Sequence, residues 1–243
     1  QMNKLLWRDD HYITQLNPDG TMRDFVDYDA NLLAIAFKVA PLERSLAIMK
    51  RVMSGKCVHA NPLNPRPTYV SEKYYGKADC YLENTGDSEV TMGRIGWAEA
   101  HARAQLNDMQ NVYKFVLNPI MKDLFNYTWL YERYTCESKP THNNYYIEYP
   151  EMLVMIIHEL VYGINIGLNK IVIAPSEEKK AFEYHVGNVH VVYSKERIVL
   201  DRMPLPDGFE KQIEIRNLYK NTNYALVEYR AMKRRVLASN QMT

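Results

Sequence analysis

The chain has 243 residues, enough for one substantial hydrophobic core or for a large domain with a small second one. Its 30 lysines and arginines nearly balance its 29 aspartates and glutamates, so it lacks the basic surface that nucleic-acid binding requires. No stretch reaches the ~18 uncharged apolar residues of a membrane-spanning helix, and the three cysteines have no CxxC spacing for a zinc site. We therefore expect neither a nucleic-acid nor a membrane partner, and no metal or cofactor is indicated.

The first strong pattern predicts a pair of helices over residues 29–39 and 42–53, which carry apolar side chains at helical spacing. Asp27 or Asp29 can cap the first helix, and Pro41 suits the first turn of the second. Because the joint between them is very short, the two helices should form an antiparallel αα-hairpin.

A second hairpin is predicted after residues 56–87, a long segment with little periodicity. Its helices span residues 89–106 and 109–125. Pro119 is expected to kink or divide the second helix, because proline lacks the backbone N–H that a helix interior needs.

The third predicted hairpin starts with a short helical turn around residues 129–134. A polar, aromatic loop over residues 135–149 leads to a long apolar helix over residues 150–164, with proline in its first turn. The helical region thus contains about three hairpins.

Beyond Gly167 the helical periodicity gives way to alternation of apolar and polar side chains, as in residues 189–193. Strands are predicted over residues 170–174, 182–186, 188–194, 197–202, 212–217 and 224–231. We expect a mainly α chain with a C-terminal β region. Residues 1–169 would form the helical part, and residues 170–243 a small antiparallel sheet or sandwich.

Several short motifs follow one another along the helical region. In chain order they are DYDANLLAIAF at residues 27–37, GDS at 86–88, GRIGW at 93–97, WLYERY at 129–134 and EYP at 148–150. Together with repeated hairpins before a terminal β-domain, they resemble the C-terminal part of a six-hairpin glycosidase, similar to the α-L-rhamnosidases. The resemblance covers roughly residues 5–175 and implies part of an (α/α)6 barrel that hydrolyses glycosidic bonds. A full barrel needs twelve helices and this chain supplies about six, so we expect a fragment without the upstream half-barrel.

The resemblance implies that Glu132 acts as general base, in an inverting reaction where water lies between the base and the anomeric carbon. The general acid of the family generally lies in the upstream half of the barrel. Candidates for a second catalytic carboxylate within this chain are Glu83, Asp87, Glu89 and Glu148, of which Glu148 is retained. Two structural alternatives stay open: Glu132 could pair with a neighbouring arginine on a surface helix, and Glu148 could merely be favourable charge at a helix N-terminus.

Further side chains are candidates for binding a sugar, because aromatic rings can stack on a sugar face and polar groups can bind hydroxyls. They are Asp29, Arg94, Trp97, Trp129, Tyr131, Arg133, His142 and Tyr149. Structural alternatives remain here too: Asp29 as a helix cap, Trp97 as a core residue and Arg133 as a solvent-facing one.

The expected partners are a carbohydrate substrate and the rest of a barrel. An open ring of helices would expose apolar surface, which an upstream half-barrel or a second copy of the chain should cover. Two other functions remain open. The chain could be a non-catalytic toroid that binds glycans or a protein, or it could belong to a glycoside phosphorylase or a polysaccharide lyase.

Overall fold

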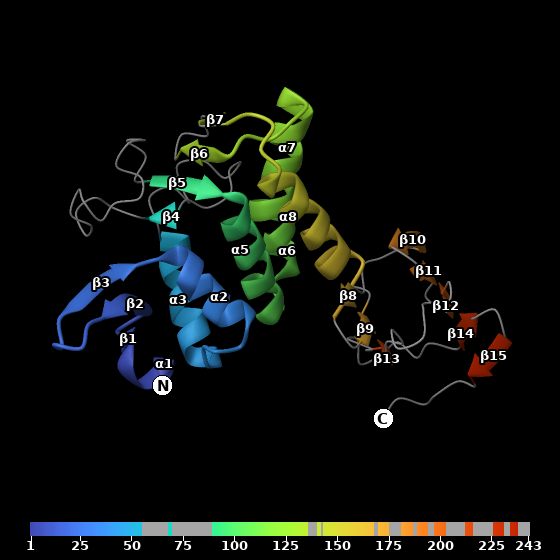
Figure 1. Ribbon diagram of the computed structural model, residues 1–243, viewed down its shortest axis with the longest axis horizontal. Coiled ribbons are helices and arrows are strands. Elements are labelled where there is room, and N and C mark those ends of the chain that lie inside the picture. The colour runs from blue at the N-terminus through green and yellow to red at the C-terminus, as the bar shows by residue number, and fades with distance from the viewer. Residues whose placement is uncertain are drawn as a thin grey trace. The chain divides into compact units, whose positions relative to one another are not determined.

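The computed structural model describes residues 1–54, 68–69, 89–135, 140–141, 143–167, 170–174, 181–186, 189–193, 197–202, 212–215, 226–230 and 234–237. The chain divides into two compact units, Gln1–Ile156 and Ile157–Thr243. The first is mainly helical and the second consists mostly of strands (Figure 1). The expected fold class, mainly α with a C-terminal β region, is confirmed. Within the described ranges, no helix combines the length and apolarity needed to cross a membrane.

The first unit opens with a small antiparallel sheet that the periodicity did not predict. After the helix α1 (Met2–Leu5), it comprises β1 (Trp7–Arg8), β2 (His11–Leu16) and β3 (Met22–Val26). The buried side chain of Asn31 fixes β2 to the next helix. Its Oδ1 accepts the Tyr12 N–H at 2.8 Å, and its Nδ2 donates to the carbonyl oxygens of Tyr12 and Asp27 at 3.0 and 2.8 Å.

The first predicted hairpin is present as α2 (Tyr28–Ala36) and α3 (Leu42–Ser54). The Asp27 carboxylate caps α2 by accepting the Asp29 N–H at 3.0 Å. α2 ends before residue 39 because Lys38 adopts a left-handed conformation with φ of 59°, which a helix cannot continue.

The second hairpin is also present, with one correction at its start. Residues 89–92, predicted as helix, form the strand β5 (Glu89–Met92), and the helix α5 (Gly93–Gln105) follows it directly. The returning helix comprises α6 (Met109–Val112), the π-helical turn η2 (Tyr113–Leu117) and α7 (Asn118–Tyr127). The Asn118 N–H bonds to the Tyr113 carbonyl five residues back. This wider turn lies directly before Pro119, where proline removes a regular hydrogen bond and its ring crowds the preceding turn.

The prediction of a helical turn at residues 129–134 is wrong. Thr128, with φ of 62°, ends α7, and β6 (Arg133–Thr135) is a strand that pairs with β5. The sheet is completed by β4 (Thr68–Tyr69) and β7 (Pro140–Thr141), in the order β4-β5-β6-β7. Tyrosine and threonine suit the pleated surface of a sheet, so strand pairing overrides the helical pattern here.

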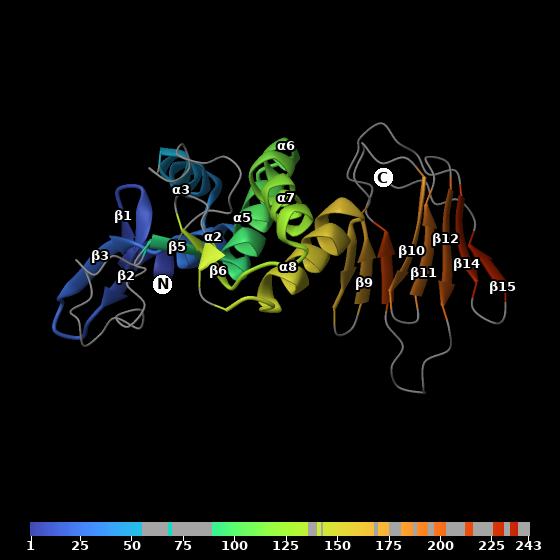
Figure 2. The same ribbon diagram turned by 90° about the horizontal axis from the view of Figure 1, so that it is seen from above.

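The last helix of the first unit is α8 (Glu148–Ile156), which starts two residues before the predicted position. The prediction that it reaches residue 164 is wrong, because Ile164 lies in a strand. α5 packs against both α2 and α8, as Figures 1 and 2 show. α5 is buried on most of its surface, and its small residues, among them Gly96, Ala98 and Ala102, allow its neighbours to approach closely.

The second unit begins with the π-helical turn η3 (Ile157–Val161) and continues as strands (Figure 2). Each of the six predicted strand regions contains a strand. The strands are β8 (Ile164–Ile166), β9 (Lys170–Ile173), β10 (Phe182–Val186), β11 (Val189–Tyr193), β12 (Arg197–Arg202), β13 (Gln212–Ile215), β14 (Leu226–Arg230) and β15 (Arg234–Leu237). They form sheets of order β10-β11-β12-β14-β15 and β13-β9-β8. Most pairs are antiparallel, but β12 with β14 and β13 with β9 are parallel.

Candidate functional site

Arg94 joins the first turns of three helices that follow one another at intervals along the chain. Its guanidinium Nε donates to Oδ2 of Asp29 on α2 at 2.8 Å. Its backbone N–H donates to Oε1 of Glu148 on α8, also at 2.8 Å. The N-terminal ends of α2, α5 and α8 therefore meet, and three residues predicted for the site, Asp29, Arg94 and Glu148, come together there.

Gly93 lets α8 lie directly against the start of α5. A Cβ atom at this position would lie 3.0 Å from the backbone nitrogen of Tyr149 and 3.1 Å from the carbonyl carbon and oxygen of Glu148. Because backbone atoms cannot swing aside as a flexible side chain can, any larger residue would separate the two helices.

The carboxylates where these helix N-termini meet are favourably placed for the helices on which they lie. Asp27, Asp29 and Glu148 lie at helix N-termini, where the partial positive charge of the helix favours carboxylates. Burial, together with the nearby Asp29 carboxylate, raises the pKa of Asp27. Burial opposes the charge of Arg94, but the hydrogen bond to Asp29 and the three carboxylates outweigh it and raise the pKa of Arg94. The Arg94 side chain is 47% exposed, so its remaining N–H groups can donate to a ligand.

Glu132 is buried and lies on neither a helix nor an exposed surface. It is 8% exposed and precedes β6. Its backbone N–H donates to the Asn143 carbonyl at 2.9 Å, and the Asn143 Nδ2 donates to Oε2 of Glu132 at 2.8 Å. These two bonds fix the carboxylate to the loop that leads into α8.

The β5–β6 pairing positions the segment around Glu132 beside the start of α5. Arg133 lies opposite Met92, the residue before Gly93, and Tyr134 lies opposite Thr91. The Arg133 and Glu89 side chains and the whole of His142, Glu83 and Asp87 lie outside the described part of the structure.

A series of aromatic rings leads from Trp129 to the first turn of α8. Trp129 contacts Tyr145 at 4.6 Å and Tyr131 at 6.4 Å between ring centroids. Tyr131 meets Tyr134 edge-on at 6.3 Å, and Tyr134 meets Tyr149 edge-on at 5.4 Å. Tyr134 and Tyr149 are buried, whereas Trp129 and Tyr131 are partly exposed. The inner two tyrosines therefore support the segment, and the outer rings are the ones that a ligand can reach.

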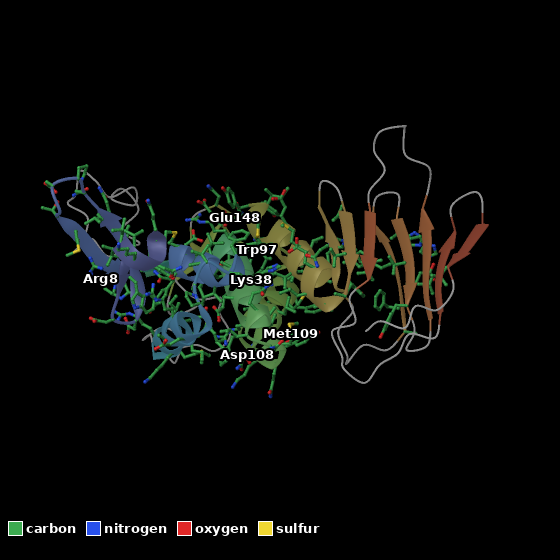
Figure 3. The ribbon with its side chains drawn as sticks, turned by 90° about the horizontal axis from the view of Figure 1, so that it is seen from below. Arg8, Lys38, Trp97, Asp108, Met109 and Glu148 are labelled. Carbon is green, nitrogen blue, oxygen red and sulfur yellow. The ribbon has the colours of Figure 1, made fainter. Side chains whose placement is uncertain are left out.

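Trp97, which was also predicted to bind sugar, packs against the buried core. It lies on α5, three residues after Arg94 in the sequence, and is labelled in Figure 3. Its ring contacts Phe37, after the end of α2, at 6.0 Å and His101 at 4.2 Å.

Sequence reasoning missed three residues that the structure places at or near the site. Asn143 holds Glu132, and Gly93 permits the close approach of α8, although its motif was noted. The third is Asp123 on α7, which lies near Tyr134: burial mainly, and the Asp123 charge in addition, raise the pKa of Tyr134. The Oδ2 of Asp123 is buried without a hydrogen-bond partner in the described structure, and burial raises the pKa of Asp123 to about 6. An Asp in the sequence NPIMKDLF gives no signal of such an environment, which arises only from packing.

The solved structures that resemble this chain over most of its length include one glycoside hydrolase. It is a GH78 family rhamnosidase of Bacillus sp. GL1, with a TM-score of 0.51 and 14% sequence identity. The match covers 89% of this chain and 23% of that protein, so the chain spans less than a quarter of its length. No protein-family model and no curated protein sequence matches. The likeness concerns the fold alone: the chain shares its arrangement of helices followed by strands with part of that rhamnosidase.

Proposed function

We propose that this chain is the C-terminal part of a six-hairpin glycosidase similar to the α-L-rhamnosidases, and that it contributes one side of a carbohydrate-binding cleft. The observation that carries the proposal is the meeting of Asp29, Arg94 and Glu148 at the N-terminal ends of three helices. The likeness to the rhamnosidase adds support for the fold.

Recognition of an uncharged sugar would divide between the polar group and the aromatic series. Arg94 donates, and the Asp29 and Glu148 carboxylates accept, so together they suit hydroxyl groups that do both. The partly exposed rings of Trp129 and Tyr131 provide a stacking surface.

Catalysis is assigned to Glu132 as general base. The hydrogen bond from Asn143 holds its carboxylate in one orientation, which positions it to accept a proton from a water molecule. Inversion needs a second carboxyl about 6.5–9.5 Å away to protonate the leaving oxygen. We assign that acid to the part of the barrel outside this chain. Glu148 already accepts the Arg94 N–H, which suits binding of a sugar hydroxyl better than proton donation.

The remaining helices of the barrel would cover apolar side chains that this unit exposes. Val154 on α8 is 60% exposed, and Leu42 at the start of α3 is 68% exposed. An upstream half-barrel or a second copy of the chain is the proposed cover.

The test uses the complete protein that contains this chain, screened against aryl glycosides that include an α-L-rhamnoside. Glu132→Gln should lower kcat at least about 100-fold, the usual scale of general-base loss, and leave sugar affinity nearly unchanged. Glu151→Gln is the control, because Glu151 is an exposed carboxylate on α8 one turn after Glu148. Retained turnover in the Glu132→Gln variant would refute the assignment. Turnover that requires inorganic phosphate would indicate a phosphorylase instead, and sugar binding without turnover would indicate a binding module.

A further inference from the structure

Two histidines and a glutamate lie on one face of the β10–β11 hairpin in the second unit. Glu183 and His185 are two residues apart on β10, so they point to the same side. His190 on β11 is the direct cross-strand partner of His185. The three side chains are thus brought together by strand register alone.

The opposite face of the same hairpin is packed with aromatic rings that hold the strands in place. Phe182 stacks on Tyr193 at 5.0 Å, and Tyr184 contacts Tyr162 at 4.6 Å between ring centroids. A rigid support of this kind is what keeps ligand atoms in position before an ion binds.

The ligand atoms lie close enough together to share one ion. One ligand atom from each of the three residues can be chosen so that all three atoms lie within 4.8 Å of one another. The Glu183 Oε1 lies 2.8 Å from the His190 Nε2 and 3.4 Å from the His185 Nε2. The two imidazole rings are parallel within 5°, with centroids 4.0 Å apart.

These distances match the coordination of a small divalent metal. Bonds of about 2.0–2.2 Å in tetrahedral geometry separate neighbouring ligand atoms by about 3.3 Å. The distance between Glu183 Oε1 and His185 Nε2 already fits. The distance between Glu183 Oε1 and His190 Nε2 must lengthen by roughly half an ångström, and the exposed Glu183 side chain can move by that much.

We propose that Glu183, His185 and His190 form a binding site for a divalent transition metal such as Zn²⁺. Two imidazoles and one carboxylate are a donor set that Zn²⁺ accepts, with water in the remaining position. The ion clamps β10 to β11 close to their turn and stabilises the hairpin. This site shares no residue with the proposed sugar site, so the two proposals stand or fall separately.

The test measures Zn²⁺ binding to the chelator-stripped full chain by calorimetry at neutral pH. One equivalent should bind to the wild type and raise its melting temperature, because an ion that binds only the folded state stabilises it. His185→Gln and His190→Gln should each weaken binding at least about tenfold, and Glu183→Gln should weaken it as well. The control is His101→Gln, which removes a histidine on α5 in the other unit and should bind like the wild type.

A second measurement on the unmodified chain does not depend on the folding of any variant. Added Ni²⁺ should broaden the imidazole NMR signals of His185 and His190 before those of the other histidines. The proposal is overturned if the wild type binds no Zn²⁺. It is also overturned if the three substitutions leave Zn²⁺ binding unchanged and Ni²⁺ does not broaden the signals of His185 and His190 first. In that event the cluster is only a set of histidine–carboxylate ion pairs.

Discussion

The guanidinium Nε of Arg94 lies 2.8 Å from Oδ2 of Asp29, which joins the first turn of α5 to the first turn of α2. Because this pair is partly exposed to solvent, its contribution to stability is small, about 1 kcal/mol or less. The contact matters instead because it fixes the positions of the Arg94 N–H donors and the Asp29 carboxylate acceptors at the N-terminal ends of the helices.

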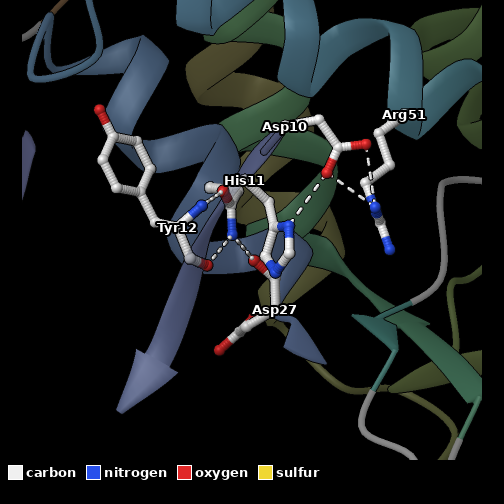
Figure 4. Close-up of polar contacts among 6 residues, drawn as sticks. Asp10, His11, Tyr12, Asp27 and Arg51 are labelled. Atoms are coloured by element: carbon white, nitrogen blue, oxygen red, sulfur yellow. Dashed lines mark hydrogen bonds and ion pairs between the residues drawn. The ribbon is translucent and has the colours of Figure 1, made fainter. Parts of the chain in front are cut away.

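Arg94→Gln should therefore weaken sugar binding about tenfold or more and change the free energy of unfolding by only about 1 kcal/mol. Calorimetric binding and urea unfolding check the two effects. The matched control is Arg51→Gln, which removes a similarly exposed ion pair, with Asp10 at 2.7 Å (Figure 4). Equal loss of sugar affinity in both variants would show that Arg94 has no particular role.

Gly93→Ala should destabilise the protein by about 1–3 kcal/mol, the usual cost of forcing an added methyl group into a closely packed contact. The new Cβ would press on the backbone of Glu148 and Tyr149. Gly96→Ala on the same helix is the control, because there the Cβ would meet Val116 and Ile120 side chains at 3.7 and 3.8 Å, an ordinary contact. Urea unfolding should show Gly96→Ala as neutral or stabilising, since alanine favours the helix; equal losses at both sites would contradict the argument.

Arg103 is 1% exposed and forms hydrogen bonds with two carboxylates, Glu99 at 2.8 Å and Asp108 at 2.9 Å. Arg103→Met should cost about 3–5 kcal/mol in unfolding free energy, because it leaves the charge of Glu99 buried without its cation. The double variant Glu99→Gln/Arg103→Met should recover part of this loss. A double variant no more stable than Arg103→Met would mean that the buried charge is not the cause.

Asp123 should make stability depend on pH below neutrality. Its pKa is raised from 3.8 to about 6 by burial, so the folded state binds the proton more tightly than the unfolded state. The free energy of unfolding should fall as the pH rises from about 4 to about 6, and then level off. Because the group is only half-buried, the change is about 1 kcal/mol after solvent screening. In the Asp123→Asn variant the free energy of unfolding should depend less on pH between about 4 and about 6. An unchanged slope would show that Asp123 is not the group responsible.

Local patterns predicted most of the elements. Helical spacing of apolar residues located α2, α3 and most of α5, and alternation located the strands from β9 to β14. These predictions succeeded because such periodicity reflects one buried face of one element. The same reasoning failed at residues 129–134, where pairing with β5, some 40 residues earlier in the chain, decides the conformation.

For the candidate site, too, the sequence predicted the residues but not the contacts between them. The motifs drew attention to Asp29, Arg94, Glu132 and Glu148, but nothing local indicated that Arg94 contacts both Asp29 and Glu148, or that Asn143 holds Glu132. The sequence analysis did not identify the histidine cluster either, because it follows from the pairing of His185 with His190 across β10 and β11.

By itself the sequence determined the fold class, the order of helices before strands and the residue types available for sugar chemistry, because these depend on composition and short-range spacing. Only the tertiary structure decided which side chains meet. The packing of α5 between α2 and α8 brings together groups that are more than 50 residues apart, such as Arg94 and Glu148. Contacts between distant segments follow from helix packing and strand pairing, and no local pattern in the chain contains that information.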